Sequence, residues 1–221
     1  MPRSYEKQLL FNQFANVGKA IGHANRLELL ELLAQGERDV ETLAKFADLS
    51  VANTSHHLQQ LRRAGLAVCR QSGQRVIYSL SDDEIVEMFS ILRRVAQNNL
   101  AEAEKMVREK FTDPDGIEQL TREELLQRID QGTAVIFDVR PELEYGFGHI
   151  KGAQKVPYEG LSQRLHEFSP DEEIVVYCRG QYCQLAYMAL KVLRDAGFKA
   201  RKLKDGFPEW RVAGFPIETG E

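Results

Sequence analysis

The chain has 221 residues, 43% of them hydrophobic and 28% charged, with three cysteines and a formal net charge of −4 at pH 7. This composition is ordinary for a globular protein, and the length accommodates two domains. No apolar run is long enough to span a membrane, the first residues lack the apolar core of a signal peptide, and three cysteines do not make a disulfide framework. We therefore expect a cytoplasmic protein with reduced thiols and no membrane contact.

Charge is distributed unevenly along the chain. Residues 1–80 carry ten Lys and Arg against seven Asp and Glu, whereas the remainder carries nineteen against twenty-six. The first segment is therefore mildly basic, which permits binding to nucleic acid but does not establish it.

Hydrophobic periodicity predicts four helices at the start of the chain. The first, over 5–21, has more large apolar residues than a single helix of this kind can bury. Three more are expected over Asn25–Leu33, Val40–Ala47 and Val51–Ala64, the last with Ser50 as its N-cap and Gly65 at its end. The brief turn between the last two indicates a helix-turn-helix, with a small helical bundle as the alternative.

A β-hairpin is predicted directly after these helices. Its strands cover 66–71 and 74–80 and are joined at Ser72-Gly73. A hairpin in this place makes the first segment a winged helix-turn-helix. One long helix is then expected from Asp82 to about Lys110.

The helix over 51–64 is expected to be the one that reads DNA. Its phasing turns one side toward the core, namely Val51, Ser55, Leu58, Leu61 and Arg62. The outward side then carries polar groups that are suited to contact base edges in a major groove. The predicted DNA contacts on this helix are Asn53, Thr54, His56, His57, Gln60 and Arg63. Those on the hairpin, for phosphate or the minor groove, are Arg70, Gln74 and Arg75, beside Gln71. A solvated helix face is the alternative interpretation.

The order of helices, hairpin and long final helix resembles the ArsR/SmtB family of bacterial transcriptional regulators. The most specific stretches are 49–58 and 61–66, and the resemblance covers about residues 8–100. It implies a homodimer, formed through the first and last helices, that binds double-stranded operator DNA. Many members sense metals, but Asp39-Val40-Glu41 stands where a Cys-Val-Cys is common, and 82–110 has neither His nor Cys. We therefore predict no metal site and no cofactor.

A second domain is expected after a polar linker at 111–116. A capping box of Thr121 and Glu124 opens a helix to Gln131, and a buried strand follows over Ala134–Arg140. Helices then alternate with strands, which indicates an α/β fold with a parallel sheet. The predicted domains are 1–110, mainly α and DNA-binding, and 117–221, α/β.

Cys178 is the candidate reactive residue of this second domain. It stands where a β-branched strand ends and a short loop leads into a helix beginning near Gln184. Free backbone N–H groups and the positive end of the helix dipole favour a thiolate there, so the loop is an anion cradle with a nucleophile at its base. The predicted substrate-binding loop is Arg179, Gly180, Gln181, Tyr182 and Cys183. A buried structural cysteine is the alternative.

The motifs around this loop come in the order and spacing of a rhodanese domain. They are Asp138-Val139-Arg140, Glu144-Tyr145, Gly148-His149-Ile150, Gly152-Ala153, Val156-Pro157, the Cys178 loop and the closing 206–210. The resemblance implies that Cys178 takes sulfane sulfur as a persulfide and passes it to an acceptor thiol, while Asp138, Arg140 and His149 hold the fold together. Related phosphatases end their loop with an arginine, and Cys183-Gln184 offers none, so phosphatase chemistry is not expected.

Two features of the loop leave alternatives open. Arg179 is its only cation, which speaks against thiosulfate as donor. Cys183 is either a small residue at a helix start or a resolving thiol that attacks a persulfide on Cys178, for which the two Cα atoms must lie within about 7 Å. Two functions therefore remain: a transcriptional regulator that responds to reactive sulfur or redox state, or a sulfurtransferase whose winged helix serves dimerisation or autoregulation.

Overall fold

The computed structural model describes residues 4–113, 115–116 and 119–220. The chain divides into two compact units, Met1–Ile85 and Val86–Glu221. Within the described residues, none of the helices has the length and apolar character needed to cross a membrane.

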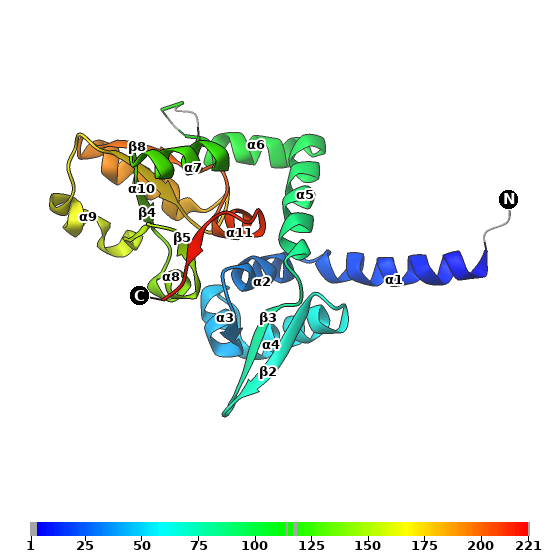
Figure 1. Cartoon of the computed structure of the whole chain (residues 1–221). Coiled ribbons are helices and arrows are strands. Elements are labelled where there is room, and N and C mark those ends of the chain that lie inside the picture. Colours follow the sequence, from blue (N-terminus) through cyan, green and yellow to red (C-terminus); the bar gives the residue numbers. More distant parts are fainter. Residues whose placement is uncertain (1–3, 114, 117–118, 221) are drawn as a thin grey trace. The chain divides into compact units, whose positions relative to one another are not determined.

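The first unit is a winged helix-turn-helix (Figure 1). It consists of α1 (Tyr5–Ile21), α2 (Ala24–Ala34), β1 (Arg38–Asp39), α3 (Val40–Phe46), α4 (Val51–Arg63), β2 (Ala67–Ser72) and β3 (Arg75–Leu80). The Ser50 side chain accepts a hydrogen bond from the Asn53 amide and caps α4, as predicted. The fold class expected for this segment is thereby confirmed.

Two details of the hairpin differ from the prediction. Ser72 pairs with Arg75, so the turn falls on Gly73-Gln74 and not on Ser72-Gly73. Gly73 has a φ of 59°, a left-handed conformation that glycine adopts without strain. The short strand β1, which the sequence did not predict, adds to β3 and makes an antiparallel sheet in the order β1-β3-β2.

The expected long helix over 82–110 is wrong in one respect, because it is two helices. They are α5 (Glu84–Asn99) and α6 (Ala101–Lys110), and Leu100 between them has an extended backbone with φ −114° and ψ 109°. The Asn99 side chain donates to the Val95 carbonyl at 2.8 Å, and asparagine is a poor helix former. The Asn99 side chain therefore competes with the backbone for a helical hydrogen bond at the point where the helix ends.

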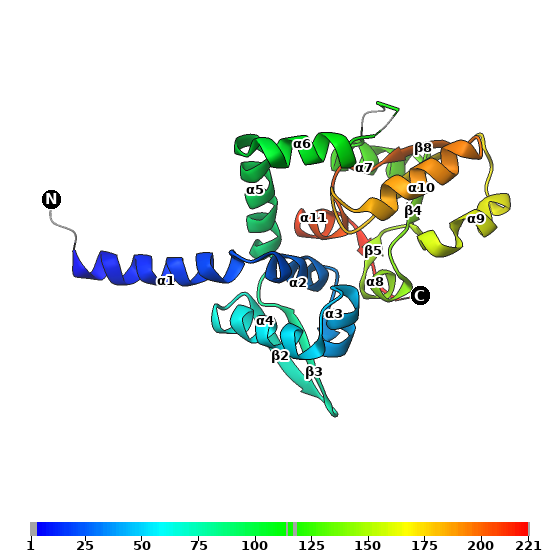
Figure 2. The same cartoon turned by 180° about the vertical axis from the view of Figure 1, so that it is seen from behind.

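The second unit continues after α6 as a rhodanese fold (Figure 2). Its helices are α7 (Arg122–Gln131), α8 (Glu142–Phe147), α9 (Leu161–Arg164), α10 (Gln184–Asp195) and α11 (Phe207–Val212), with 3-10 turns η1 (Tyr158–Gly160) and η2 (Leu165–Glu167). Its strands are β4 (Val135–Asp138), β5 (His149–Ile150), β6 (Gln154–Lys155), β7 (Glu173–Tyr177), β8 (Lys199–Lys202) and β9 (Ile217–Glu218).

The predicted parallel sheet is confirmed. Its four strands run in the order β6-β4-β7-β8, all parallel, while β5 and β9 form a separate antiparallel pair. One hydrophobic core packs the sheet against α10 and α9, and a second packs it against α7 and α11. The predicted capping box of Thr121 and Glu124 is present at the start of α7.

The segment predicted as a linker is packed onto the second unit. Arg194 of α10 holds both carboxylate oxygens of Asp113 at 2.7 Å and the Asp115 carboxylate at 2.7 Å. Pro114, which contributed to the linker prediction, and the predicted domain start at 117 lie outside the described residues. Val86 to Lys110 group with the second compact unit, and the division of function near residue 110 stays a prediction.

Candidate functional sites

Cys178 lies at the carboxyl edge of the parallel sheet, directly after β7. Its side chain is buried, and α10 begins six residues later with Cys183 as the N-cap residue. The two cysteines form a disulfide with their Cα atoms 6.2 Å apart. This separation is within the range for disulfides, so the loop curls enough to bring both sulfurs together. Of the two roles considered for Cys183, the geometry favours the resolving thiol.

The cysteine loop, residues 178–183, rests on the turn before α11. The Phe207 amide donates to the Cys178 carbonyl at 3.1 Å, and the Cys183 amide donates to the Gly180 carbonyl at 3.2 Å. A Cβ atom at Gly206 would overlap the Arg179 carbonyl group and the Gly180 nitrogen. The loop therefore has its present course only because residue 206 has no side chain.

Arg179, the single cation of the cysteine loop, is held by a buried carboxylate. Its Nε lies 2.9 and 3.0 Å from the two Glu144 oxygens, and its Nη2 lies 2.6 Å from Oε1. Glu144 is fully buried on α8. This bidentate pair neutralises the charge that the sequence offered for substrate binding.

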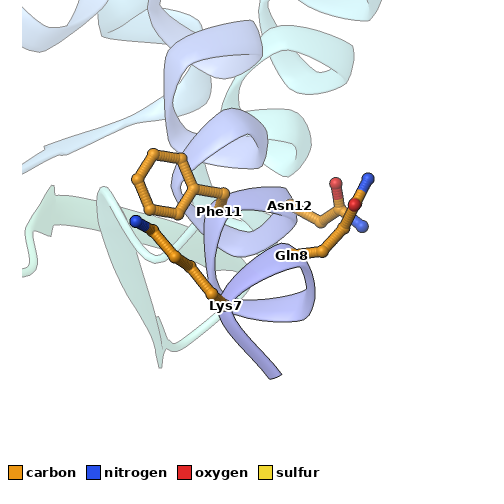
Figure 3. A pocket seen from close by; sticks show the side chains of 4 residues that line it. All are labelled: Lys7, Gln8, Phe11 and Asn12. Atoms are coloured by element: carbon orange, nitrogen blue, oxygen red, sulfur yellow. The ribbon is translucent and has the colours of Figure 1, made fainter. Parts of the chain in front are cut away.

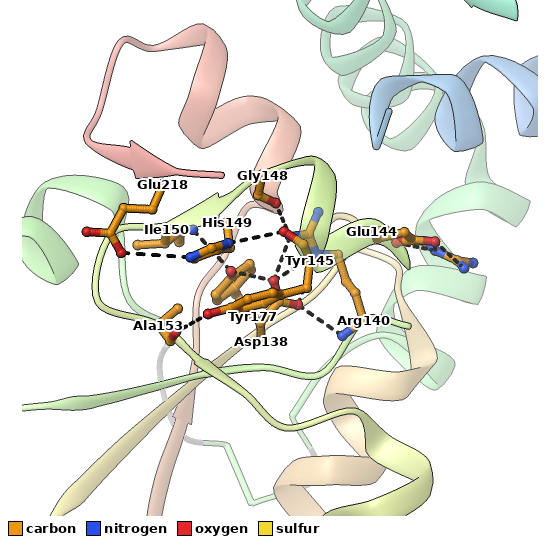
Figure 4. Close-up of polar contacts among 11 residues, drawn as sticks. Asp138, Arg140, Glu144, Tyr145, Gly148, His149, Ile150, Ala153, Tyr177 and Glu218 are labelled. Carbon is orange, nitrogen blue, oxygen red and sulfur yellow. Dashed lines mark hydrogen bonds and ion pairs between the residues drawn. The ribbon is translucent and has the colours of Figure 1, made fainter. Parts of the chain in front are cut away.

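A buried polar network below the loop involves Asp138, Arg140 and Tyr177 (Figure 4). Arg140 donates to both Asp138 oxygens and to the Gly148 carbonyl, and the Tyr177 hydroxyl donates to Asp138 at 2.5 Å. Burial, then the nearby Asp138 carboxylate, raises the pKa of Tyr177 well above 10. The groups satisfy one another, which fits the structural role expected for Asp138 and Arg140.

His149 lies beside this network and contacts Tyr145 (Figure 4). Its ring stacks on Tyr145 with centroids 3.7 Å apart, and its Nδ1 donates to the Tyr145 carbonyl at 3.1 Å. The histidine is buried with its ring occupied on one face, so it orders the turn into β5. This placement agrees with the structural role expected for His149.

Tyr182 connects the cysteine loop to the helices that precede the rhodanese fold. Its hydroxyl donates to Gln97 Oε1 on α5 at 2.9 Å, and its ring meets Phe111, after α6, edge-on at 5.3 Å. The Tyr187 hydroxyl of α10 donates to the Phe111 carbonyl and accepts from Gln119 at 2.9 Å. Sequence reasoning missed Gln97, Phe111 and Tyr187 as parts of this site, because no local pattern marks a contact that spans more than seventy residues.

On α4, two of the predicted DNA contacts are wrong, because Thr54 and His57 are buried. They share the inner face with Leu58 and Leu61, whereas Val51 and Arg62, expected inside, are exposed. The buried stripe is thus rotated from the predicted one, since two polar residues occupy core positions. The His57 ring lies 4.6 Å from the His23 ring, and burial, followed by the charges of His23 and Arg26, lowers the pKa of His57.

The remaining candidates on α4 face outward. Asn53, His56 and Arg63 are exposed, and Gln60 is half-buried. The Gln60 amide oxygen accepts from Arg26 at 2.6 Å, and its nitrogen lies 2.7 Å from His56 Nε2. Arg26 also donates to the Lys19 carbonyl, so α1, α2 and α4 are joined through one guanidinium.

The cations of the hairpin are paired with carboxylates. Arg70 pairs with Glu37, and Arg75 lies 3.1 Å from Asp39. Burial raises the pKa of Asp39, but hydrogen bonds from Thr42 and the charge of Arg75 lower it overall. Asp39 also caps α3, so the residue that stands where metal-sensing relatives have cysteine has a structural role here. Gln74 is exposed at the turn.

Comparisons with known proteins match both halves of the chain. Residues 23–67 match the model of the bacterial regulatory protein, arsR family, and residues 121–213 match the rhodanese-like domain. The HTH-type transcriptional regulator Rv0324 of Mycobacterium tuberculosis is 39% identical over 218 residues, covering 99% of this chain and 96% of that protein. A sulfurtransferase of Allochromatium vinosum is 28% identical over 107 residues, which are 48% of this chain and 98% of that protein.

One of the similar solved structures is the homodimeric winged helix-turn-helix DNA-binding domain Mb0332 of Mycobacterium bovis. It is 35% identical and covers 46% of this chain and 94% of its own, with a TM-score of 0.42. Fold and sequence together define a winged helix-turn-helix transcriptional regulator with a second, rhodanese domain. The chain belongs to the ArsR-type regulators, in the subset that carries the rhodanese domain at the C-terminus.

Proposed function

We propose that this regulator senses reactive sulfur through Cys178 and reports it to operator DNA. The observation that carries the proposal is that the cysteine loop contains the two reactive sulfurs and also contacts the helices that precede the rhodanese fold. The loop brings Cys178 and Cys183 within disulfide distance, and its Tyr182 contacts α5 and the end of α6. A chemical change at the sulfurs is thereby linked to the helices that follow the winged helix-turn-helix.

The chemistry needs two thiolates and one sulfur donor. The Cys178 thiolate attacks the terminal sulfur of a donor persulfide, the donor S–S bond breaks, and the donor leaves as a thiolate. Cys183 can then attack Sγ of the Cys178 persulfide, which expels hydrosulfide and closes the disulfide. A cellular dithiol returns the pair to thiols by exchange. The Cα separation of 6.2 Å supports the second step.

Sulfur loading is the direct test of this proposal. Reduced full-length protein treated with a persulfide donor is expected to gain sulfur on Cys178, or a Cys178–Cys183 disulfide, by peptide mass spectrometry. Cys178→Ser should gain neither, because a hydroxyl cannot hold sulfane sulfur, whereas Cys69→Ser on β2 should react like wild type. Loading of Cys69 with Cys178 unmodified would overturn the assignment.

We infer that the regulator acts as a homodimer in the cytoplasm. Large apolar side chains on α1 are exposed, among them Tyr5, Leu10, Phe11 and Phe14. A pocket of about 300 Å³ on this helix is lined by Lys7, Gln8, Phe11 and Asn12. Figure 3 shows how these four side chains extend from α1. A second copy of α1 would cover this surface, and the similarity to a homodimeric winged helix domain supports the same assembly.

A dimer of this kind should read two half-sites about one helical turn apart. Gln60→Ala or Arg63→Ala is expected to relax the base preference, because Arg63 is exposed on α4 and half-buried Gln60 lies beside exposed His56. Arg75→Ala should weaken all duplexes alike and reduce the slope of log affinity against log salt by about 1, as expected for one phosphate contact. Selection from random duplexes followed by salt titration measures both effects. A selection that yields no preferred sequence would contradict specific binding.

Sulfurtransferase activity is the second candidate function. The similarity to the Allochromatium sulfurtransferase over nearly its whole length favours it. The two functions are compatible, since an enzyme cycle and a sensor both begin with a persulfide on Cys178. Multiple turnovers with an acceptor thiol would mark the enzyme, whereas a single loading event suffices for the sensor.

A further inference from the structure

A polar cavity of about 500 Å³ lies beside the cysteine loop. Gln181 of the loop forms part of its wall, and Lys204 and Asp205 contribute from the segment just after β8. It is therefore at the carboxyl edge of the sheet, where ligands of parallel α/β folds bind. The remaining wall comes from α5, the start of α7 and α11, and includes Arg93, Arg94, Arg122, Glu123 and Glu209.

The cavity presents charges of both signs. Some neutralise each other: Arg93 lies 3.6 Å from Glu209, and Arg122 lies 3.0 Å from Asp205. Arg94, Lys204 and Glu123 are exposed in the wall and have no ion-pair partner among the residues that the structure describes. Two cations and one carboxylate are thus available to a ligand.

The cysteine loop itself offers no cation for an inorganic anion. Arg179 is held by both oxygens of buried Glu144, and Gln181 and Tyr182 are uncharged. A small dianion such as thiosulfate would therefore lie beside Cys178 without a counter-charge from the loop. A donor can be held more strongly if its body extends into the cavity.

Resting on the proposed chemistry of Cys178, we propose that this cavity binds the body of the sulfur donor, and that the donor is a persulfide of an amino-acid or peptide thiol. Carboxylates of the donor would meet Arg94 and Lys204, and its ammonium group would meet Glu123. The volume suits a ligand of this size and greatly exceeds that of thiosulfate. In the transfer, the donor's terminal sulfur forms a bond to Cys178, and the remaining thiolate leaves with the electron pair.

The rate of sulfur loading on Cys178 of the reduced full-length protein tests this site. The probes are glutathione persulfide, which carries carboxylates and an ammonium group, inorganic hydrogen disulfide, which has no body, and thiosulfate. Arg94→Ala combined with Lys204→Ala is expected to slow loading from glutathione persulfide roughly tenfold and to leave hydrogen disulfide unchanged. Lys191→Ala, an exposed lysine on α10 outside the cavity, is the matched control. Thiosulfate should be the slowest donor throughout.

A second readout does not need sulfur transfer. Binding of unreactive S-methylglutathione, followed by calorimetry, should weaken in the double variant and persist in the control. Equal loading from thiosulfate and glutathione persulfide, or equal slowing of both persulfides, would overturn the cavity assignment while Cys178 still reacts. If Cys178 reacts with none of the donors, the proposed function fails as well, so the two failures are distinguishable.

Discussion

Sulfur loading of Cys178 is expected to change the affinity for operator DNA by roughly 5- to 150-fold, the range of an ordinary allosteric coupling. The physical reason is that residues 179–182 lie between the two reactive sulfurs. Opening or closing the Cys178–Cys183 bond removes or adds a constraint on their backbone, and Tyr182 among them donates to Gln97 and packs on Phe111. Titration of an operator duplex with reduced and with sulfur-loaded protein measures the change.

Single variants separate the steps of this coupling. Cys178→Ser should not respond, and Tyr182→Phe should load sulfur normally but respond less, because it lacks the hydroxyl that reaches α5. If loaded wild type shifts and Cys183→Ser does not, the disulfide is the signal; if both shift, the persulfide suffices. Linkage requires that operator DNA alter the equilibrium loading of Cys178 by the same factor. Equal affinities of reduced and loaded wild type would exclude coupling.

Gly206→Ala is expected to slow sulfur loading of Cys178 by roughly a hundredfold, a typical result of displacing a reactive group by about 1 Å. The added methyl group would overlap the backbone of Arg179 and Gly180, so either the cysteine loop or the turn before α11 must shift. We also expect the rhodanese unit to lose about 3 kcal/mol of stability, as for other forced insertions into a packed site. Loading kinetics and urea unfolding measure the two effects.

Gly160→Ala is the control for this substitution. Gly160 is the last residue of the short turn η1, its φ is −107°, and a Cβ there meets nothing within 4 Å. That variant should load sulfur and unfold like wild type. If Gly206→Ala did the same, the cysteine loop would not depend on the close approach at residue 206.

The sequence alone determined the features that depend on residues close together in the chain. Ser50 and Thr121 identified helix starts because an N-cap acts on amides two or three residues away. The β-branched run before Cys178 identified a buried strand, and the order of motifs indicated both families. These features depend on neighbours in the chain, which the sequence displays directly.

Only the tertiary structure decided which surfaces the side chains meet. Thr54 and His57 were predicted to contact DNA, yet the packing of α4 buries both. Arg179 was predicted to be a cation of the substrate-binding loop, but Glu144, 35 residues earlier, neutralises its charge. The Tyr182 hydroxyl donates to Gln97, which is 85 residues away in the sequence. Such contacts depend on how distant elements are brought together, and the same residue type is compatible with either outcome until its partner is known. The sequence therefore determined the two families and the position of the reactive cysteine, while the fold decided its partners and the charge around it.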